Sequence, residues 1–264
     1  MIGIAKGQVA VVVALVLFLT VGCIGRLRVG DVQTKSETVA LEDAPEVDVA
    51  IRMGAGQIQL GGGADGLMTG EFTYNVDAWE PEVAYEVRGD IGYLSIEQPA
   101  MDESNIGIPD DSIRNEWDVR LAEDVPMSLA VQLGASDADL DLENVNVRRL
   151  TLQSGAGDNS VNLGGTLSTL DVQMGAGELR LNFNDDWQQN LEATVTAGVG
   201  QLTLLLPADT GVRVAVQQGL GSIDAVNLRQ DGDVYVNEAY EQAETTLDIR
   251  VEGGLGQIVL EVIE

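Results

Sequence analysis

Apolar and polar residues alternate along most of the chain, and a Gly-x-Gly triplet repeatedly interrupts the alternation. In TLDVQMGAGELRLNF, apolar residues stand five and seven positions before Gly177 and return two and four positions after it. Period-two alternation on both sides of a glycine predicts a strand, a sharp bend and a second strand, each with one inward face. Seven segments share the pattern, centred on Gly56, Ser136, Gly157, Gly177, Gly200, Gly221 and Gly256.

The middle of the chain repeats this unit at a nearly fixed period. Successive centres from Ser136 to Gly221 are 21, 20, 23 and 21 residues apart. A unit of about 20 residues cannot bury its own apolar face, so this period predicts a stack of repeats. We therefore expect an all-β fold of stacked short strands, a β-solenoid. Its outer face would carry a column of amides able to form hydrogen-bonded ladders, comprising Gln132, Gln153, Gln173 and Gln217.

The glycine triplets raise the question of phosphate binding. A phosphate-binding loop leads into a helix N-terminus, whereas a strand pattern follows each triplet here. The one true G-x-G-x-x-G, from Gly61 to Gly66, also precedes a strand pattern. Glycine permits positive φ and close backbone approach at a bend. The sequence therefore predicts structural corners at Gly54, Gly56, Gly155, Gly157, Gly175, Gly177, Gly198, Gly200, Gly219, Gly221, Gly254 and Gly256.

The 80 residues between the first and second centres do not follow the repeat. They contain the alternating segments GEFTYNV, EVAYEVRGDIGYLSIEQ and EWDVRLAEDVPMSLAVQL, with a polar loop, QPAMDESNIGIPDDS, between the last two. These segments predict an antiparallel β insertion with a turn at Gly89-Asp90.

The composition excludes several kinds of partner and site. The chain has 43 acidic and 14 basic side chains, no His and a single Cys. A formal charge of −29 argues against nucleic acid as a partner, because phosphate binding depends on Lys and Arg. The absence of His and of a second Cys excludes the usual zinc sites, internal disulfides and Ser-His or Cys-His catalytic pairs. We expect no cofactor.

The N-terminal segment is apolar from Val9 to Gly25, which is short for a transmembrane helix and typical of a signal peptide. Leu19-Thr20-Val21-Gly22-Cys23 resembles the lipobox of bacterial lipoproteins, and by that resemblance Cys23 is lipidated after cleavage. The alternative is an uncleaved signal anchor, because Arg26 and Arg28 follow directly. We therefore predict a signal peptide or signal anchor helix over residues 1–22, a polar tether over residues 23–45 and a membrane-held body facing the extracytoplasmic side.

Acidic residues provide two candidate sites. Asp137, Asp139 and Asp141 share one face of a predicted strand, and Asp158 occupies the place of Asp137 one unit later. Carboxylates in a column suit Ca²⁺, although any solvent-facing strand shows the same alternation. The loop carboxylates of Asp102, Glu103, Asp110 and Asp111 could pair for acid–base catalysis, as in a cell-wall polysaccharide hydrolase or lyase on a β-helix.

Aromatic residues are few, at 4% of the chain. Trp117 lies within a predicted strand and is expected in the core. Trp79 and Trp187 stand in polar, loop-like settings and are better candidates for an exposed stacking surface, with core or cap as the alternative.

Several segments together resemble the toast-rack family, with its LiaF-related envelope domains from bacterial stress-response proteins. They are MGAGQIQLGGGADGLMTGEFTYN, the serial GAG units, LPADTGVRVAVQQGLGSIDA and VNEAYEQAETTLDIRVEGGLGQIVLEV. The resemblance implies an N-terminal toast-rack domain, placed at residues 46–128, and C-terminal adhesin-like repeats at residues 129–264. It also implies that Tyr240 covers one end of the stack, and it implies no catalytic residues.

These features predict a non-enzymatic, membrane-anchored envelope protein that presents a rigid surface to an envelope protein or polymer and takes part in envelope stress sensing. The alternative is the hydrolase or lyase. The final segment, GQIVLEVIE, reads as an exposed edge strand, which allows homodimerisation edge to edge.

Overall fold

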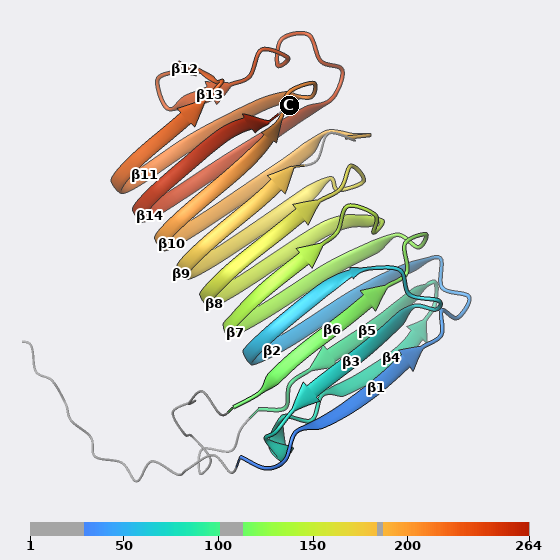
Figure 1. Cartoon of the computed structure of the whole chain (residues 1–264). Helices are drawn as coiled ribbons and strands as arrows, with labels where there is room; N and C mark the ends of the chain where they lie inside the picture. The colour runs from blue at the N-terminus through green and yellow to red at the C-terminus, as the bar shows by residue number, and fades with distance from the viewer. Residues whose placement is uncertain (1–28, 101–112, 184–186, 264) are drawn as a thin grey trace, which may run out of the picture.

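The computed structural model describes residues 29–100, 113–183 and 187–263, and almost all of their regular structure is β-strand (Figure 1). The predicted signal or anchor helix and Cys23 lie outside the described residues. One 3-10 turn, η1 (Asp77–Trp79), is present among the described residues. The predicted all-β class is confirmed for this part of the chain.

Seven long strands, each passing through a bend, form the stack seen in Figure 1. Their bends lie side by side in the predicted register, so that Gly157 pairs with Gly177 and Gly177 with Gly200. All seven run parallel to their neighbours in the stack. They are β2 (Glu46–Gly62), β7 (Met127–Asp141), β8 (Val147–Leu163), β9 (Thr169–Phe183), β10 (Leu191–Pro207), β11 (Gly211–Val226) and β14 (Thr246–Ile263).

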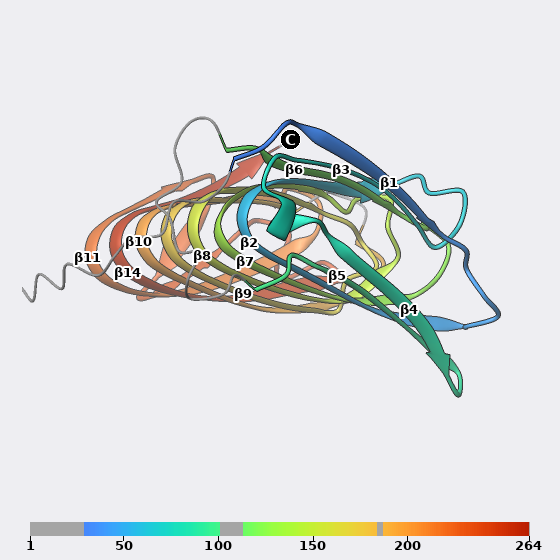
Figure 2. The same ribbon diagram turned by 90° about the horizontal axis from the view of Figure 1, so that it is seen from below.

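Each bend divides its strand into a first and a second arm, and the arms build two facing layers with the core between them (Figure 2). In β9, Leu170 and Val172 of the first arm and Leu179 and Leu181 of the second arm are all buried. One hydrophobic cluster extends from β2 to β14. The boundary predicted between residues 128 and 129 falls inside β7, and this shared core spans both sides of it.

The two glycines of a triplet are required for different reasons, one conformational and one steric. The second one has positive φ in every unit except that of Ser136, as Gly177 does at 123°. A Cβ on Gly177 would also lie 2.1 Å from the Gly157 carbonyl oxygen of the neighbouring strand. The first glycine lacks positive φ, but a Cβ on Gly175 would lie 2.4 Å from the carbonyl oxygen of Gly155. Close stacking of backbones therefore requires both glycines.

The order of strands in the stack departs from their order in the sequence at the C-terminal end. The last strand, β14, lies between β10 and β11 and pairs with both along its length. The prediction that GQIVLEVIE forms an exposed edge is therefore wrong, since both edges of β14 are occupied. After β10 the chain leaves one strand position empty and forms β11 beyond it; β14 then occupies the empty position.

The N-terminal end of the stack is covered by the inserted segment. Its strands are β3 (Met68–Tyr74), β4 (Glu82–Arg88), β5 (Ile91–Glu97) and β6 (Asn115–Leu121). The predicted antiparallel pairs are present as β4–β5, with their turn at Gly89-Asp90, and β3–β6. The attachment to β2 is parallel instead. The first arm of β2 pairs with β5 and the second arm with β6.

Part of the predicted tether is a strand. β1 (Gln33–Val39) pairs antiparallel with β3 at the edge of the sheet. The correction has a simple cause: an edge strand that buries little surface can be built from polar residues, and QTKSETV exposes every second side chain.

At the C-terminal end, a short hairpin of β12 (Arg229–Asp231) and β13 (Val234–Val236) covers only the first arm of β11. Tyr240 is half-buried in the turn that follows. The buried amide of Asn237 fixes this turn, because its Nδ2 donates to the carbonyl oxygen of Thr210 at 2.7 Å and its Oδ1 accepts from the Val212 N–H at 2.9 Å.

Candidate functional site

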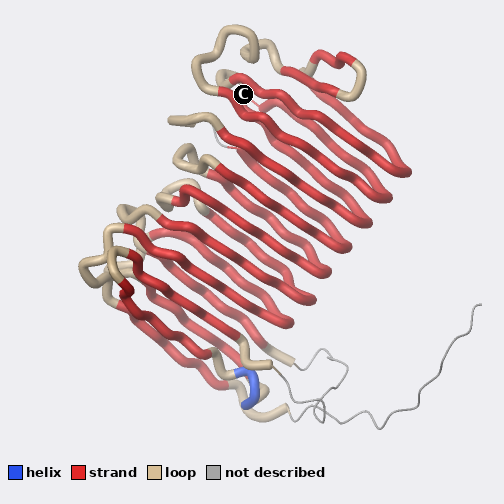
Figure 3. Tube along the Cα trace, turned by 180° about the vertical axis from the view of Figure 1, so that it is seen from behind, coloured by secondary structure: helices blue, strands red, loops and turns tan. Residues whose placement is uncertain are grey.

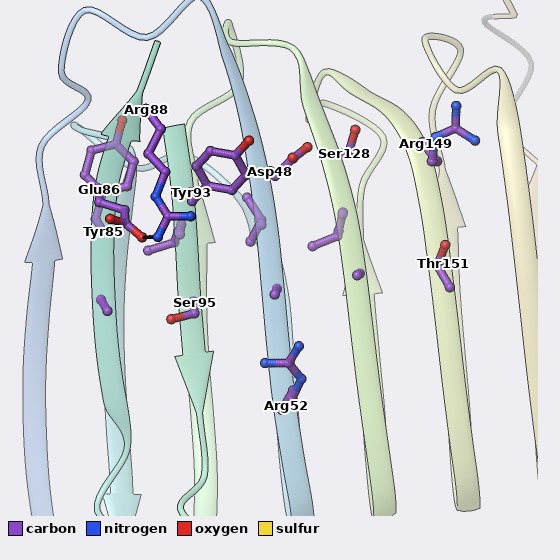
Figure 4. A pocket seen from close by; sticks show the side chains of 16 residues that line it. Asp48, Arg52, Tyr85, Glu86, Arg88, Tyr93, Ser95, Ser128, Arg149 and Thr151 are labelled. Carbon is purple, nitrogen blue, oxygen red and sulfur yellow. Dashed lines mark hydrogen bonds and ion pairs between the residues drawn. The ribbon is translucent and has the colours of Figure 1, made fainter. Parts of the chain in front are cut away.

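A groove of about 810 Å³ crosses the outer face of the first arms, from β4 through β5, β2 and β7 to β8 (Figure 4). Outward side chains of neighbouring strands stand in rows because the strands are in register. Three such rows build the groove and its surroundings, and they run across the strands rather than along them.

The floor of the groove is a row of small side chains. Ser95 pairs with Ala84 on one side and with Ala50 on the other, and the row continues through Ala130 to Thr151. Larger residues would fill this space. A trough therefore runs perpendicular to five adjacent strands, and four strand-to-strand steps give it a length of roughly 19 Å.

One wall carries aromatic and charged groups. Its row contains Glu86, Tyr93, Asp48, Ser128 and Arg149, which are neighbours in register. The Arg88 guanidinium forms an ion pair with Glu86 and stacks over the Tyr93 ring at 5.5 Å from its centroid (Figure 4). The ring of Tyr93 is thereby held in a fixed place beside the trough.

The other wall is the predicted amide column. Gln132, Gln153 and Gln173 stand in register and continue into Arg52, whose Nε donates to the Gln132 Oε1 at 3.2 Å. Gln217 is separated from them because Thr196 of β10 and Glu252 of β14 occupy the intervening places. A second groove of about 710 Å³ lies on the far side of this wall, over the first glycines of the triplets.

The charge of this face differs from that of the whole chain. Arg52, Arg88 and Arg149 line the first groove, although the chain has only 14 basic residues against 43 acidic ones. Arg52 and Arg88 are each paired with a carboxylate, from Glu97 and Glu86. Behind the wall, the side chain of Tyr85 packs over Gly92, and burial raises the pKa of its hydroxyl.

Two carboxylates, Asp48 and Glu86, line the groove together with the aromatic ring of Tyr93. Glu86 forms an ion pair with Arg88. The loop carboxylates of Asp102, Glu103, Asp110 and Asp111 lie outside the described residues.

Two of the four calcium candidates accept hydrogen bonds from the backbone of the next strand. The Asp137 Oδ1 accepts a hydrogen bond from the Asp158 N–H at 3.0 Å, and the Asp158 Oδ1 accepts one from the Glu178 N–H at 3.2 Å. Asp139 and Asp141 are exposed along β7. Within the described ranges, no three Asp, Glu, His or Cys side chains come together in a way that could hold a metal ion.

All three tryptophans are buried. Trp117 lies in the core, as predicted, donates to the Asn115 Oδ1 at 3.0 Å and packs edge to face with Phe72. Trp79 is 1% exposed and Trp187 is 8% exposed, so neither forms the exposed stacking surface for which both were the better candidates. Trp79 is buried in η1 beside the bend of β2, and Trp187 packs against Phe183, so both take the core-or-cap alternative. The described residues contain no helix whose length and apolarity would let it cross a bilayer.

The residues of the groove were not singled out from the sequence, although a signal for its floor existed. Six positions before the centres, the alignment has Ala50, Ala130 and Thr151, and then the charged Asp171. Tyr93, Arg88 and Ser95 come from the insertion, whose register with β2 the sequence does not reveal.

Fold and groove define a class: a stacked all-β protein that carries a surface trough on one layer. The chain belongs to the family described as the N-terminal domain of toast_rack, DUF2154, whose model matches residues 28–169 and again residues 164–205. The predicted family resemblance is confirmed.

Comparison with solved structures finds similar chains from several bacteria. A candidate cell adhesion protein from Clostridium sporogenes is 25% identical, with a TM-score of 0.69 over 88% of this chain and 100% of that one. A candidate adhesin from Bacteroides fragilis is 12% identical, with a TM-score of 0.27 over 89% and 99% of the two chains. A candidate lipid binding protein from Parabacteroides distasonis is 9% identical, with a TM-score of 0.34 over 90% and 100%. The last two likenesses are too weak to support any argument. No curated protein matches the sequence.

Proposed function

We propose that this chain is a non-enzymatic, membrane-anchored protein of the bacterial cell envelope that binds an extended glycan in the trough across β4, β5, β2, β7 and β8. The observation that carries the proposal is the row of small side chains between two polar walls. The family and the Clostridium structure, named for cell adhesion, support a surface protein that works by contact.

A glycan suits the chemistry of the trough better than a peptide does. Hydroxyl and guanidinium groups line the groove and can bond to sugar hydroxyls, the amides of Gln132 and Gln153 stand in the adjoining row, and Tyr93 contributes an aromatic ring. Side chains recur at the strand spacing of about 4.8 Å, which is close to the advance of one sugar unit in an extended chain. The floor of the trough lies on the face of paired strands, where a peptide has no backbone edge to extend; of the described strands that form it, only β4, which pairs with β5 alone, has a free outer edge.

The resemblance to stress-response relatives implies a part in sensing envelope stress. In that role, the binding of glycan in the trough is the signal. A rigid stack changes little on binding, so a bound polymer would hold the protein in place. Such retention close to the membrane could be read by a partner there.

The test is binding of the full-length protein to a panel of soluble cell-wall glycan fragments, measured by calorimetry. Ala130→Trp fills the floor and is expected to weaken binding at least tenfold, or about 1.4 kcal/mol. Thr194→Trp is the matched control, because Thr194 continues the same row two strands beyond the trough. Equal binding by the two variants would refute the site. Release of new reducing ends from the glycan would refute the non-enzymatic role.

A further inference from the structure

An exposed apolar ridge lies along the bends of the last three strands of the stack. Val199, Leu255 and Leu220 are the middle residues of the triplets in β10, β14 and β11, and they are neighbours in register. They are 52%, 54% and 72% exposed, respectively. Three large apolar side chains side by side on a surface usually mark a contact with something apolar.

The same position is different elsewhere in the stack. The middle residues of the other four triplets are all alanine: Ala55, Ala135, Ala156 and Ala176. The residue after each triplet changes at the same place, from Asp158 and Glu178 to neutral residues such as Gln201 and Gln257. The end of the edge at β10, β14 and β11 is therefore both more apolar and less charged than its middle.

The chain enters the structure on this same edge. Gln33 pairs with Tyr74 and Tyr74 with Asn115, whose Nδ2 donates to the Ala55 carbonyl oxygen at the bend of β2 at 2.6 Å. Val29 and Val32, just before β1, are 41% and 53% exposed. Figures 1 and 3 show the start of β1 and the bends on one side of the molecule, and the loops that join β7 to β8 and β8 to β9 on the other.

We propose that the bend edge rests on the lipid bilayer, with Val29 and Val32 at one end and the ridge of Val199, Leu255 and Leu220 at the other. The proposal rests on the membrane anchoring proposed above. Only Arg26, Leu27 and Arg28 separate the apolar run that ends at Gly25 from Val29, and three residues span at most about 11 Å. The bend edge at β1 must then lie close to the membrane surface.

The two apolar ends lie about 40 Å apart, since β11 is nine strand positions from β1. Two contacts at this separation fix the long axis of the stack parallel to the bilayer and leave the trough on a side face. Between them, the bends of β7, β8 and β9 carry Asp137, Asp158 and Glu178. These carboxylates are repelled by anionic lipid, so the edge fits a zwitterionic surface better than an anionic one.

The test uses the full-length protein in phosphatidylcholine vesicles with brominated acyl chains, which quench nearby tryptophan fluorescence. The native tryptophans are buried and provide a constant baseline. Leu220→Trp is expected to be quenched several-fold more than Asn144→Trp, which places the reporter in an exposed turn on the opposite edge. Replacing half of the lipid with phosphatidylglycerol should reduce the quenching. Adding Val199→Ala and Leu255→Ala to Leu220→Trp should reduce it further without unfolding, because both side chains are exposed.

Flotation of the vesicles separates the outcomes. If the variants float but Leu220→Trp is not quenched, the protein is anchored to the membrane, but the inference that its bend edge rests on the bilayer is wrong. If Leu220→Trp is shielded from soluble quenchers but not quenched by bromolipid, a second copy covers the ridge and the inference is again wrong. If nothing floats, the proposed anchoring fails and the inference fails with it.

Discussion

The bends of β7, β8 and β9 and those of β10, β14 and β11 stack in one continuous register but carry different side chains. In the first group, alanine occupies the tip and the carboxylates of Asp137 and Asp158 accept backbone hydrogen bonds from the next strand. In the second group, Val199, Leu255 and Leu220 project from the tip beside neutral residues. The contrast separates the glycines, which build the bend, from the tip residues, which are free to meet a partner.

The two groups also differ in how the chain builds them. The strands from β7 to β10 add one after another in sequence order, so each is covered soon after it is made. The second group is completed only when β14 enters between β10 and β11. The end of the stack that carries the apolar ridge therefore depends on the last 19 residues of the chain.

The largest expected effect comes from removing these residues. Deletion of residues 246–264 leaves β10 with a bare edge and β11 without its parallel neighbour. We expect loss of cooperative folding at this end and aggregation, measured by circular dichroism and size-exclusion chromatography. Removal of residues 30–39 takes away β1, which is paired on one side only, and should cost far less. Equal damage from both deletions would contradict the topology.

A substitution in the glycine column should have the next largest effect. Gly177→Ala combines a φ of 123° with a Cβ placed 2.1 Å from a backbone oxygen, and we expect a loss of about 4 kcal/mol of unfolding free energy. Ser136→Ala is the matched control, because Ser136 already carries a Cβ and its buried Oγ has no hydrogen-bond partner among the described residues. Its cost should stay below about 1 kcal/mol in urea unfolding.

Two leucines, one buried in the core and one exposed at a bend, provide a third test. Leu179→Ala removes a buried side chain and should cost about 3 kcal/mol. Leu220→Ala removes an exposed one and should change stability by less than about 0.5 kcal/mol. Comparable losses in thermal unfolding would mean that the ridge is part of the core and not a free surface.

The smallest expected effect belongs to the carboxylate column. Asp158→Ala leaves the Glu178 N–H without its acceptor and should cost about 1 kcal/mol. Asp158→Asn keeps an oxygen in place and should cost less. The unfolding free energy of both variants should be insensitive to added calcium; stabilisation of the wild type by calcium that both variants lose would restore the metal interpretation.

The bends, the strand faces and the register of the stack could all be predicted from the sequence, because period two and a glycine at each corner are local signals. The position of β14 could not, since its local pattern is the same as that of any other unit. β1 was missed because an edge strand can be polar, and the polar sequence around Trp79 and Trp187 left open whether they are exposed or buried as core or cap; the structure shows both buried. For the trough, the alignment of the repeat units shows only the small residues of its floor, at Ala50, Ala130 and Thr151.

The most direct measurement is hydroxyl-radical footprinting of the full-length protein in native cell envelopes and after extraction with detergent. Tyr93 lines the trough and is half-buried in the protein alone, and Tyr240, also half-buried, lies in the turn after β13 and serves as the reference. Bound glycan should protect Tyr93 in the envelope, and bilayer contact should protect Leu220, while Tyr240 is modified equally in both samples. Equal modification of Tyr93 in envelopes and in extracted protein would contradict the binding trough.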